Sequence, residues 1–110
     1  MFVGLDLHKN YLQAAVVDDR GSLLKQQRIP NEDESIESFF DDELKKNTNE
    51  IVIESSSTWY HVYELLSKNT QNHVILSNPI KTKAIASAKV KTDKIDALTL
   101  ANLLRGRIYP

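Results

Sequence analysis

The sequence predicts an α/β domain in which helices cover both faces of a mixed β-sheet. Strand-like segments come first and in succession, and helical and strand-like segments then alternate. The 110 residues are enough for one domain with a real core. The expected order is β-β-β-α-β-α-β-α, with room for one further helix before the end of the chain.

The first segments are expected to form an antiparallel meander. Residues 1–7 are an apolar run that carries one acid, Asp6. Residues 11–17 (YLQAAVV) are rich in strand formers. Residues 22–29 (SLLKQQRI) are more polar, which is typical of a strand near the sheet edge. The sequence DDRG between the last two supplies a turn.

The next segment has the spacing of one amphipathic helix. Its apolar residues recur at i, i+3, i+4 and i+8, and the helix is expected to end at Lys45 and Lys46. Acids in its first turns and these lysines in its last turn match the helix dipole. The apolar stripe consists of Ile36, Phe39, Phe40 and Leu44.

A strand–helix–strand unit follows, and its length favours a parallel crossover connection. Residues 50–54 (EIVIE) and 73–76 (HVIL) are short and apolar, as buried strands are. The packed stripe of the helix between them is expected to be Trp59, Val62, Tyr63 and Leu66. Residues 80–90 are alanine-rich with interspersed lysines and fit either a helix or a connecting segment.

The last helix is expected to begin near Thr92 and to end at Arg105, with Gly106 as its C-cap. Its apolar stripe must face the sheet, and two acids of the first turn share that stripe. Helix capping explains one of these acids and only partly explains the second. The stripe consists of Asp93, Asp96, Ala97, Leu100 and Leu104.

Acidic side chains from distant parts of the chain are expected to meet at one edge of the sheet. Asp6 lies on the first strand, Glu54 closes a later strand, and Asp93 and Asp96 begin the last helix. Ligands of such sheets bind at the carboxyl ends of the strands. Crowded carboxylates cannot all ionise without counter-charge, which Mg²⁺ or Mn²⁺ supplies through oxygen ligands. Two such ions would support phosphodiester chemistry.

Charge is unevenly distributed along the chain. Residues 1–67 contain 6 Lys and Arg against 13 Asp and Glu, and residues 68–110 contain 8 against 2, although the net charge is −1. The basic second half is either a footprint for nucleic acid or a solvated surface. The basic residues beside the proposed acidic site are Lys81, Lys83, Lys89, Lys91 and Lys94.

Composition argues against several other classes of protein. The sequence has no cysteine, which excludes disulfides and thiolate metal sites. It has no apolar run long enough to span a bilayer and no signal peptide at its start. A cytoplasmic protein without a membrane partner is therefore expected.

Sequence motifs along the whole chain carry a family resemblance. They are GLDLHK at 4–9, ESSSTWY at 54–60, SNP at 77–79 and KTDKIDA at 91–97. Together they resemble the N-terminal domain of the DEDD-type insertion-sequence transposases, a family that also contains pilin-gene invertases. The chain departs from that pattern at Ser57, where the family usually has Gly, and in the order Trp59-Tyr60. The turn after Glu54 is therefore expected to differ.

The resemblance implies a ribonuclease-H-like (RuvC-like) domain that acts in a prokaryotic DNA transposase or site-specific recombinase. It implies that Asp6, Glu54, Asp93 and Asp96 hold Mg²⁺ or Mn²⁺, with two ions expected. DNA is the implied partner, some family members use a guide RNA, and we expect a homo-oligomer. In the family, a C-terminal domain supplies a nucleophilic serine. Residues 1–110 are therefore expected to be a single N-terminal domain of a longer recombinase, catalytically incomplete alone.

His8 and Lys9 are secondary candidates because they follow Asp6 directly. His8 lies on the same strand face as Asp6 and could contact the metal-holding carboxylates or form only local hydrogen bonds. Lys9 could neutralise the acids, hold a phosphate or stay in solvent. Two other functions remain open, a non-catalytic nucleic-acid-binding or dimerisation module of the same fold and an actin-like ATPase. The ATPase would need a glycine-rich phosphate loop, which His8-Lys9-Asn10 does not provide.

Overall fold

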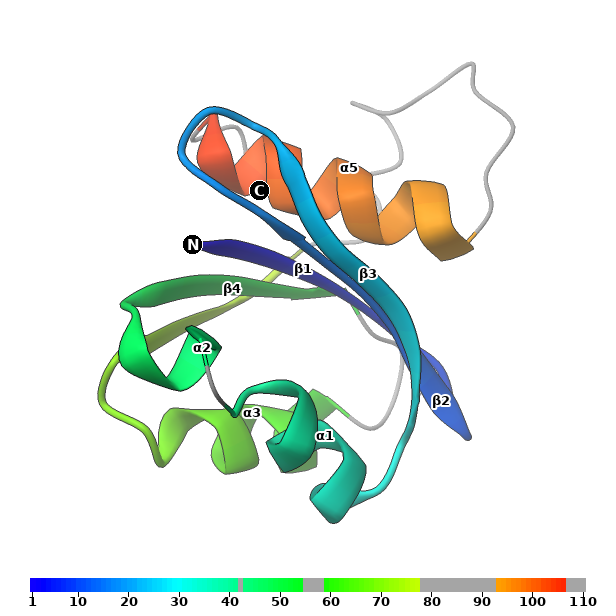
Figure 1. Cartoon of the computed structure of the whole chain (residues 1–110). Coiled ribbons are helices and arrows are strands. Elements are labelled where there is room, and N and C mark those ends of the chain that lie inside the picture. Colours follow the sequence, from blue (N-terminus) through cyan, green and yellow to red (C-terminus); the bar gives the residue numbers. More distant parts are fainter. Residues whose placement is uncertain (42, 55–58, 78–92, 107–110) are drawn as a thin grey trace.

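The computed structural model describes residues 1–41, 43–54, 59–77 and 93–106, with the backbone alone for residues 43 and 93–96. Within these ranges, a five-stranded sheet has the order β3-β2-β1-β4-β5 (Figure 1). The strands are β1 (Phe2–Leu7), β2 (Tyr11–Val17), β3 (Leu23–Pro30), β4 (Asn49–Glu54) and β5 (Asn72–Leu76). The helices are α1 (Asp33–Phe39), α2 (Glu43–Lys46), α3 (Trp59–Ser67) and α5 (Asp93–Arg105).

The sheet is mixed, as the sequence predicts. β1, β2 and β3 form the antiparallel meander, and β4 and β5 are added in parallel beyond β1. The central strand β1 is buried on both faces, which explains its continuous apolar sequence. The edge strand β3 is mostly exposed, in agreement with its polar composition.

Helices cover both faces of the sheet (Figure 1). α1 and α3 lie on one face, and α5 lies on the other, over β1, β2 and β4. Because side chains alternate along a strand, Val3 and Leu5 belong to the larger apolar core on the α1–α3 side. A smaller cluster lies under α5 and consists of Val52, Leu100 and Leu104.

The close approach of α5 to β1 depends on Gly4. A Cβ at Gly4 would lie 2.7 Å from the backbone nitrogen of Ala101 and 2.9 Å from the Cβ of Leu100. At the other end of the helix, a Cβ at Gly21 in the β2–β3 turn would lie 3.0 Å from the side chain of Arg105. The helix therefore runs antiparallel to β1, and its first turn lies at the end of the sheet where β1 and β4 end (Figure 1).

The prediction of one amphipathic helix that ends at Lys46 is wrong, because the structure has two helices, α1 and α2, in its place. At the end of α1, the Phe40 N–H is shared between the carbonyls of Ile36 (3.3 Å) and Glu37 (3.2 Å). Asp41 follows, and an acid is unfavourable at a helix C-terminus. The predicted stripe is nevertheless buried: Ile36, Phe39, Phe40 and Leu44.

In α3, one position of the predicted stripe is wrong. Val62 and Leu66 are buried and Trp59 packs against the larger core, but Tyr63 is 37% exposed. Leu65, three residues after Val62, is buried in its place. The ring of Tyr63 meets that of Trp59 edge to face, with ring centroids 6.1 Å apart.

The end of α5 agrees with the prediction, since the N–H of Gly106 donates to the carbonyl of Asn102 (3.0 Å). The predictions for residues 55–58 and 80–90 lie outside the described residues. None of the described helices is long and apolar enough to cross a membrane.

Candidate functional site

Asp6 and Glu54 lie side by side on two neighbouring parallel strands. They are register partners in β1 and β4, so both side chains are on the sheet face that α5 covers. The exposed fraction is 6% for Asp6 and 9% for Glu54. The preceding partners on this face, Gly4 and Val52, pack under the helix. Asp6 and Glu54 are therefore the first polar pair on this face of the sheet, immediately beyond the pair that packs under α5.

Asp93 and Asp96 belong to the first turn of α5, which lies at the same end of the sheet. A Cβ at Gly4 would meet the carbonyl oxygen of Ala97, and Gly4 precedes Asp6 by two residues on β1. The helix backbone thus begins on the Asp6 side of this contact. The side chains of Asp93 and Asp96 lie outside the described part of the structure.

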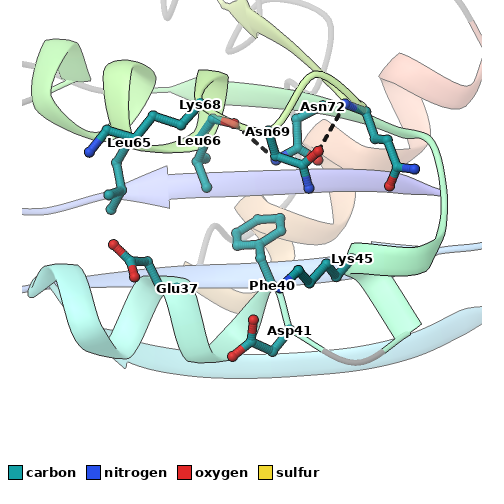
Figure 2. Close-up of a pocket in the computed structure, with 10 residues that line it drawn as sticks. Glu37, Phe40, Asp41, Lys45, Leu65, Leu66, Lys68, Asn69 and Asn72 are labelled. Carbon is teal, nitrogen blue, oxygen red and sulfur yellow. Dashed lines mark hydrogen bonds between the residues drawn. The ribbon is translucent and has the colours of Figure 1, made fainter.

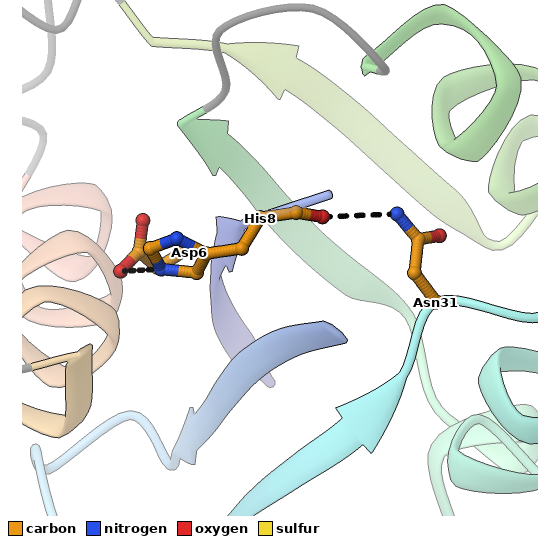
Figure 3. A network of polar contacts seen from close by, with 3 residues as sticks. All are labelled: Asp6, His8 and Asn31. Atoms are coloured by element: carbon orange, nitrogen blue, oxygen red, sulfur yellow. Dashed lines mark hydrogen bonds and ion pairs between the residues drawn. The ribbon is translucent and has the colours of Figure 1, made fainter. Parts of the chain in front are cut away.

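His8 contacts Asp6 directly (Figure 3). Its Nε2 atom lies 3.0 Å from Oδ2 of Asp6. The imidazole stacks on the ring of Tyr11, with centroids 4.6 Å apart and an interplanar angle of 18°. The guanidinium of Arg28 lies 4.1 Å from the centre of the same tyrosine ring. These contacts fix the orientation of His8, whereas the next residue, Lys9, is exposed.

Asn31 holds the turn between β1 and β2, as Figure 3 shows in part. Its Nδ2 atom donates to the carbonyls of His8 (3.1 Å) and Lys9 (3.4 Å). Its backbone N–H donates to the carbonyl of Asn10 (3.0 Å). Sequence reasoning missed this role, because Asn31 is more than 20 residues away from the turn that it contacts.

The predicted basic surface lies mostly outside the described residues. Lys81, Lys83, Lys89 and Lys91 fall in the range 78–92, and Lys94 is described by its backbone alone, in the first turn of α5. Within the described residues, no three His, Asp or Glu side chains are grouped closely enough to hold a metal ion by themselves.

Tyr60, in the first turn of α3, is 59% exposed. Its ring meets that of Trp59 edge to face, with centroids 5.4 Å apart. The negative charge of Glu64, and then a hydrogen bond to that carboxylate, raise the pKa of Tyr60 above its ordinary value of 10.0.

A separate groove of about 520 Å³ lies between α1 and α3 (Figure 2). Phe40, Leu65 and Leu66 supply apolar lining, and charged side chains such as Glu37 and Lys68 complete it. None of the residues that the sequence predicts for the site lines this groove. Its lining comes from α1, α3 and the segments beside them. These helices lie on the sheet face opposite to α5 (Figure 1), whereas Asp6 and Glu54 are on the face that α5 covers.

Comparison with known proteins agrees with the ribonuclease-H-like architecture of this mixed sheet. A family model of IS110-type DEDD transposases, described as "Transposase", matches residues 3–110. The transposase for insertion sequence element IS1533 of Leptospira borgpetersenii is 35% identical over 108 residues. The alignment covers 96% of this chain and 31% of that relative, so the chain spans about a third of the relative's length. The chain thus belongs to the DEDD transposase family.

Proposed function

We propose that the chain is the catalytic domain of a DNA transposase that cleaves and rejoins phosphodiester bonds with divalent metal ions. The observation that carries this proposal is the register pairing of Asp6 with Glu54, both buried, at the end of the sheet where α5 begins. Two carboxylates at one level of neighbouring strands ionise together only when positive charge is close. A site that holds cations is the simplest reason for such a pair.

Mg²⁺ or Mn²⁺ fits this donor set, because hard cations prefer carboxylate oxygens. Asp6 and Glu54 would hold the ions together with Asp93 and Asp96, whose helix begins at the same end of the sheet. When bound, two such ions would activate a nucleophile and stabilise the leaving oxygen. His8 would orient the Asp6 carboxylate through its 3.0 Å contact with Oδ2.

The substrate that we propose is DNA, because the matching family and the named relative are transposases. The five lysines of the predicted basic surface would contact its phosphates, and Lys9 would add a contact at the turn beside Asp6. Since the chain spans 31% of that relative, we propose that strand transfer needs a further, serine-bearing domain. We also propose that the transposase forms a homo-oligomer and that a guide RNA is part of its complex.

Calorimetric titration with Mn²⁺, combined with thermal unfolding, tests the metal part of this proposal. The chain is expected to bind Mn²⁺ with submillimolar affinity and to unfold at a higher temperature in its presence, because a ligand of the folded state stabilises it. Asp6→Asn and Glu54→Gln remove a charge with little change in volume, and each should abolish this shift. Glu34→Gln, at an exposed position of α1, is the matched control and should keep it.

If the chain shows no Mn²⁺ affinity and Asp6→Asn behaves as the unchanged chain does, the metal-dependent enzyme is ruled out. The non-catalytic module of the same fold would then be the better description. Stabilisation by ATP, with no response to Mn²⁺ alone, would instead support the actin-like alternative.

A further inference from the structure

Gln13 extends the row of polar side chains formed by Asp6 and Glu54. In the antiparallel pair of β1 and β2, Gln13 is the register partner of Asp6, which is itself the register partner of Glu54. In an antiparallel pair, register partners point to the same face of the sheet, with Cβ atoms about 4.5–5.5 Å apart. Register partners in a parallel pair also share a face. Gln13, Asp6 and Glu54 therefore lie at one level of the sheet, on the face covered by α5.

The Gln13 side chain is buried at a free-energy cost. Its exposed fraction is 1%, and its Oε1 atom has no hydrogen-bond partner in the described structure. A buried acceptor without a partner costs about 1–3 kcal/mol. The next residues of β2 on this face are Ala15 and Val17, both buried and apolar. Packing alone would thus favour an apolar residue at position 13 as well.

The unpartnered Oε1 belongs to a residue one strand away from Asp6 and two strands away from Glu54. The Oε1 atom of Gln13 needs a donor, and ionised carboxylates cannot supply one because they only accept hydrogen bonds. A hydrated cation supplies both positive charge and donors, because its bound waters carry polarised O–H groups. Mg²⁺ keeps several waters when it binds to proteins, and acceptors around a metal orient its ligands.

We propose that Gln13 is a positioning residue of the metal centre, whose Oε1 accepts a hydrogen bond from a water on the cation held by Asp6 and Glu54. This inference rests on the proposed metal-dependent function. Gln13 does not touch the ion, so its effect is on affinity and water placement. The amide is neutral, and it adds this contact without adding to the negative charge of the row.

The test compares Gln13→Met with the same change at Gln27, which is exposed on the edge strand β3. Mn²⁺ affinity is measured by calorimetry, and thermal unfolding is measured with and without Mn²⁺. In Gln13→Met, Mn²⁺ affinity should fall about tenfold or more, while the unfolding temperature without metal should be unchanged or higher, because the unpartnered oxygen is gone. Gln27→Met should change neither quantity.

A second variant keeps the acceptor. Gln13→Glu should bind Mn²⁺ at least as tightly as the unchanged chain and should be less stable without metal, because a third acid joins the row. Wild-type affinity in Gln13→Met overturns the proposal for Gln13. If the unchanged chain and Asp6→Asn behave as proposed, that result leaves the metal centre intact. If the unchanged chain binds no Mn²⁺, both proposals are wrong.

Discussion

Asp6 on β1 and Glu54 on β4 are register partners in a parallel pair of strands, and each is at least nine-tenths buried. Two residues earlier on the same strand, Gly4 leaves room for the backbone of α5. β1 therefore carries Asp6 and also packs against α5, the helix whose first turn contains Asp93 and Asp96. The position of α5 on Gly4 sets where that turn lies relative to Asp6.

Gly4→Ala should displace α5. The added Cβ would meet the backbone of Ala97 and Ala101, and backbone cannot yield as a flexible side chain can. We expect a loss of at least about 1–3 kcal/mol in the free energy of unfolding, measured with urea. Mn²⁺ affinity should fall as well, since Asp93 and Asp96 move with the helix.

Gly21→Ala is the control for the helix position. Gly21 has a φ of 86°, where a side chain costs roughly 1–2 kcal/mol, but the atoms nearest to an added Cβ belong to the end of the Arg105 side chain and not to the helix backbone. Stability should fall and Mn²⁺ affinity should not. If Gly4→Ala has the same free energy of unfolding as the unchanged chain, α5 does not pack closely against β1 at Gly4.

His8→Leu should weaken Mn²⁺ binding by about tenfold, because residues that orient a metal-holding carboxylate typically contribute that much. His8→Gln keeps a donor near Oδ2 of Asp6 and should recover part of the affinity. His73→Leu changes a histidine whose side chain is 68% exposed on β5 and should have no effect. If calorimetry gives the same Mn²⁺ affinity for all three variants, His8 has no role in the metal site.

Asn31→Ala should loosen the turn that carries His8 and Lys9. Two side-chain hydrogen bonds disappear, at a net cost of roughly 1–3 kcal/mol. The amide of His8, which donates to Tyr11, should exchange with deuterium faster than in the unchanged chain at matched global stability. Asn69→Ala, which removes a bond to the Gln71 N–H, should leave that amide unaffected. No difference between the two variants would contradict the role of Asn31.

DNA affinity should fall steeply with salt, since protein groups that bind phosphates release bound counterions. Changing Lys81, Lys83 and Lys89 together to Gln should make the plot of log affinity against log salt less steep, by about 0.9 for each lysine that binds a phosphate. Changing Lys45, Lys46 and Lys68 to Gln removes the same charge from the α2–α3 side and should leave the slope unchanged. Binding that does not depend on salt would argue against a nucleic-acid surface in residues 81–89.

The strands could be predicted from the sequence to within one residue at most ends. Short apolar runs, the polar composition of an edge strand and flanking turn residues are local signals, so β1, β2 and the edge position of β3 followed directly. The break between α1 and α2 did not, because the apolar spacing from Ile36 to Leu44 continues through it. A helix end depends on its terminal hydrogen bonds, and those at Phe40 are not encoded in the apolar pattern.

The stripe of Ala97, Leu100 and Leu104 correctly predicted which face of α5 meets the sheet. The close approach of α5 to Gly4 was not predicted, although a glycine inside a strand is a recognised sign of close backbone approach. The level at which Asp6 meets Glu54 could not be deduced, because register between strands far apart in sequence is set by packing of the whole sheet. The only signal for Gln13 was an amide within the otherwise apolar end of YLQAAVV.

The most direct test of the metal centre is a crystal structure grown with Mn²⁺ and measured at the manganese absorption edge. The expected result is anomalous density between the carboxylates of Asp6 and Glu54, with oxygens of Asp93 and Asp96 completing the coordination. Absence of such density, with Glu54 turned toward solvent or Asp96 facing away from Asp6, would contradict a metal-dependent transposase site.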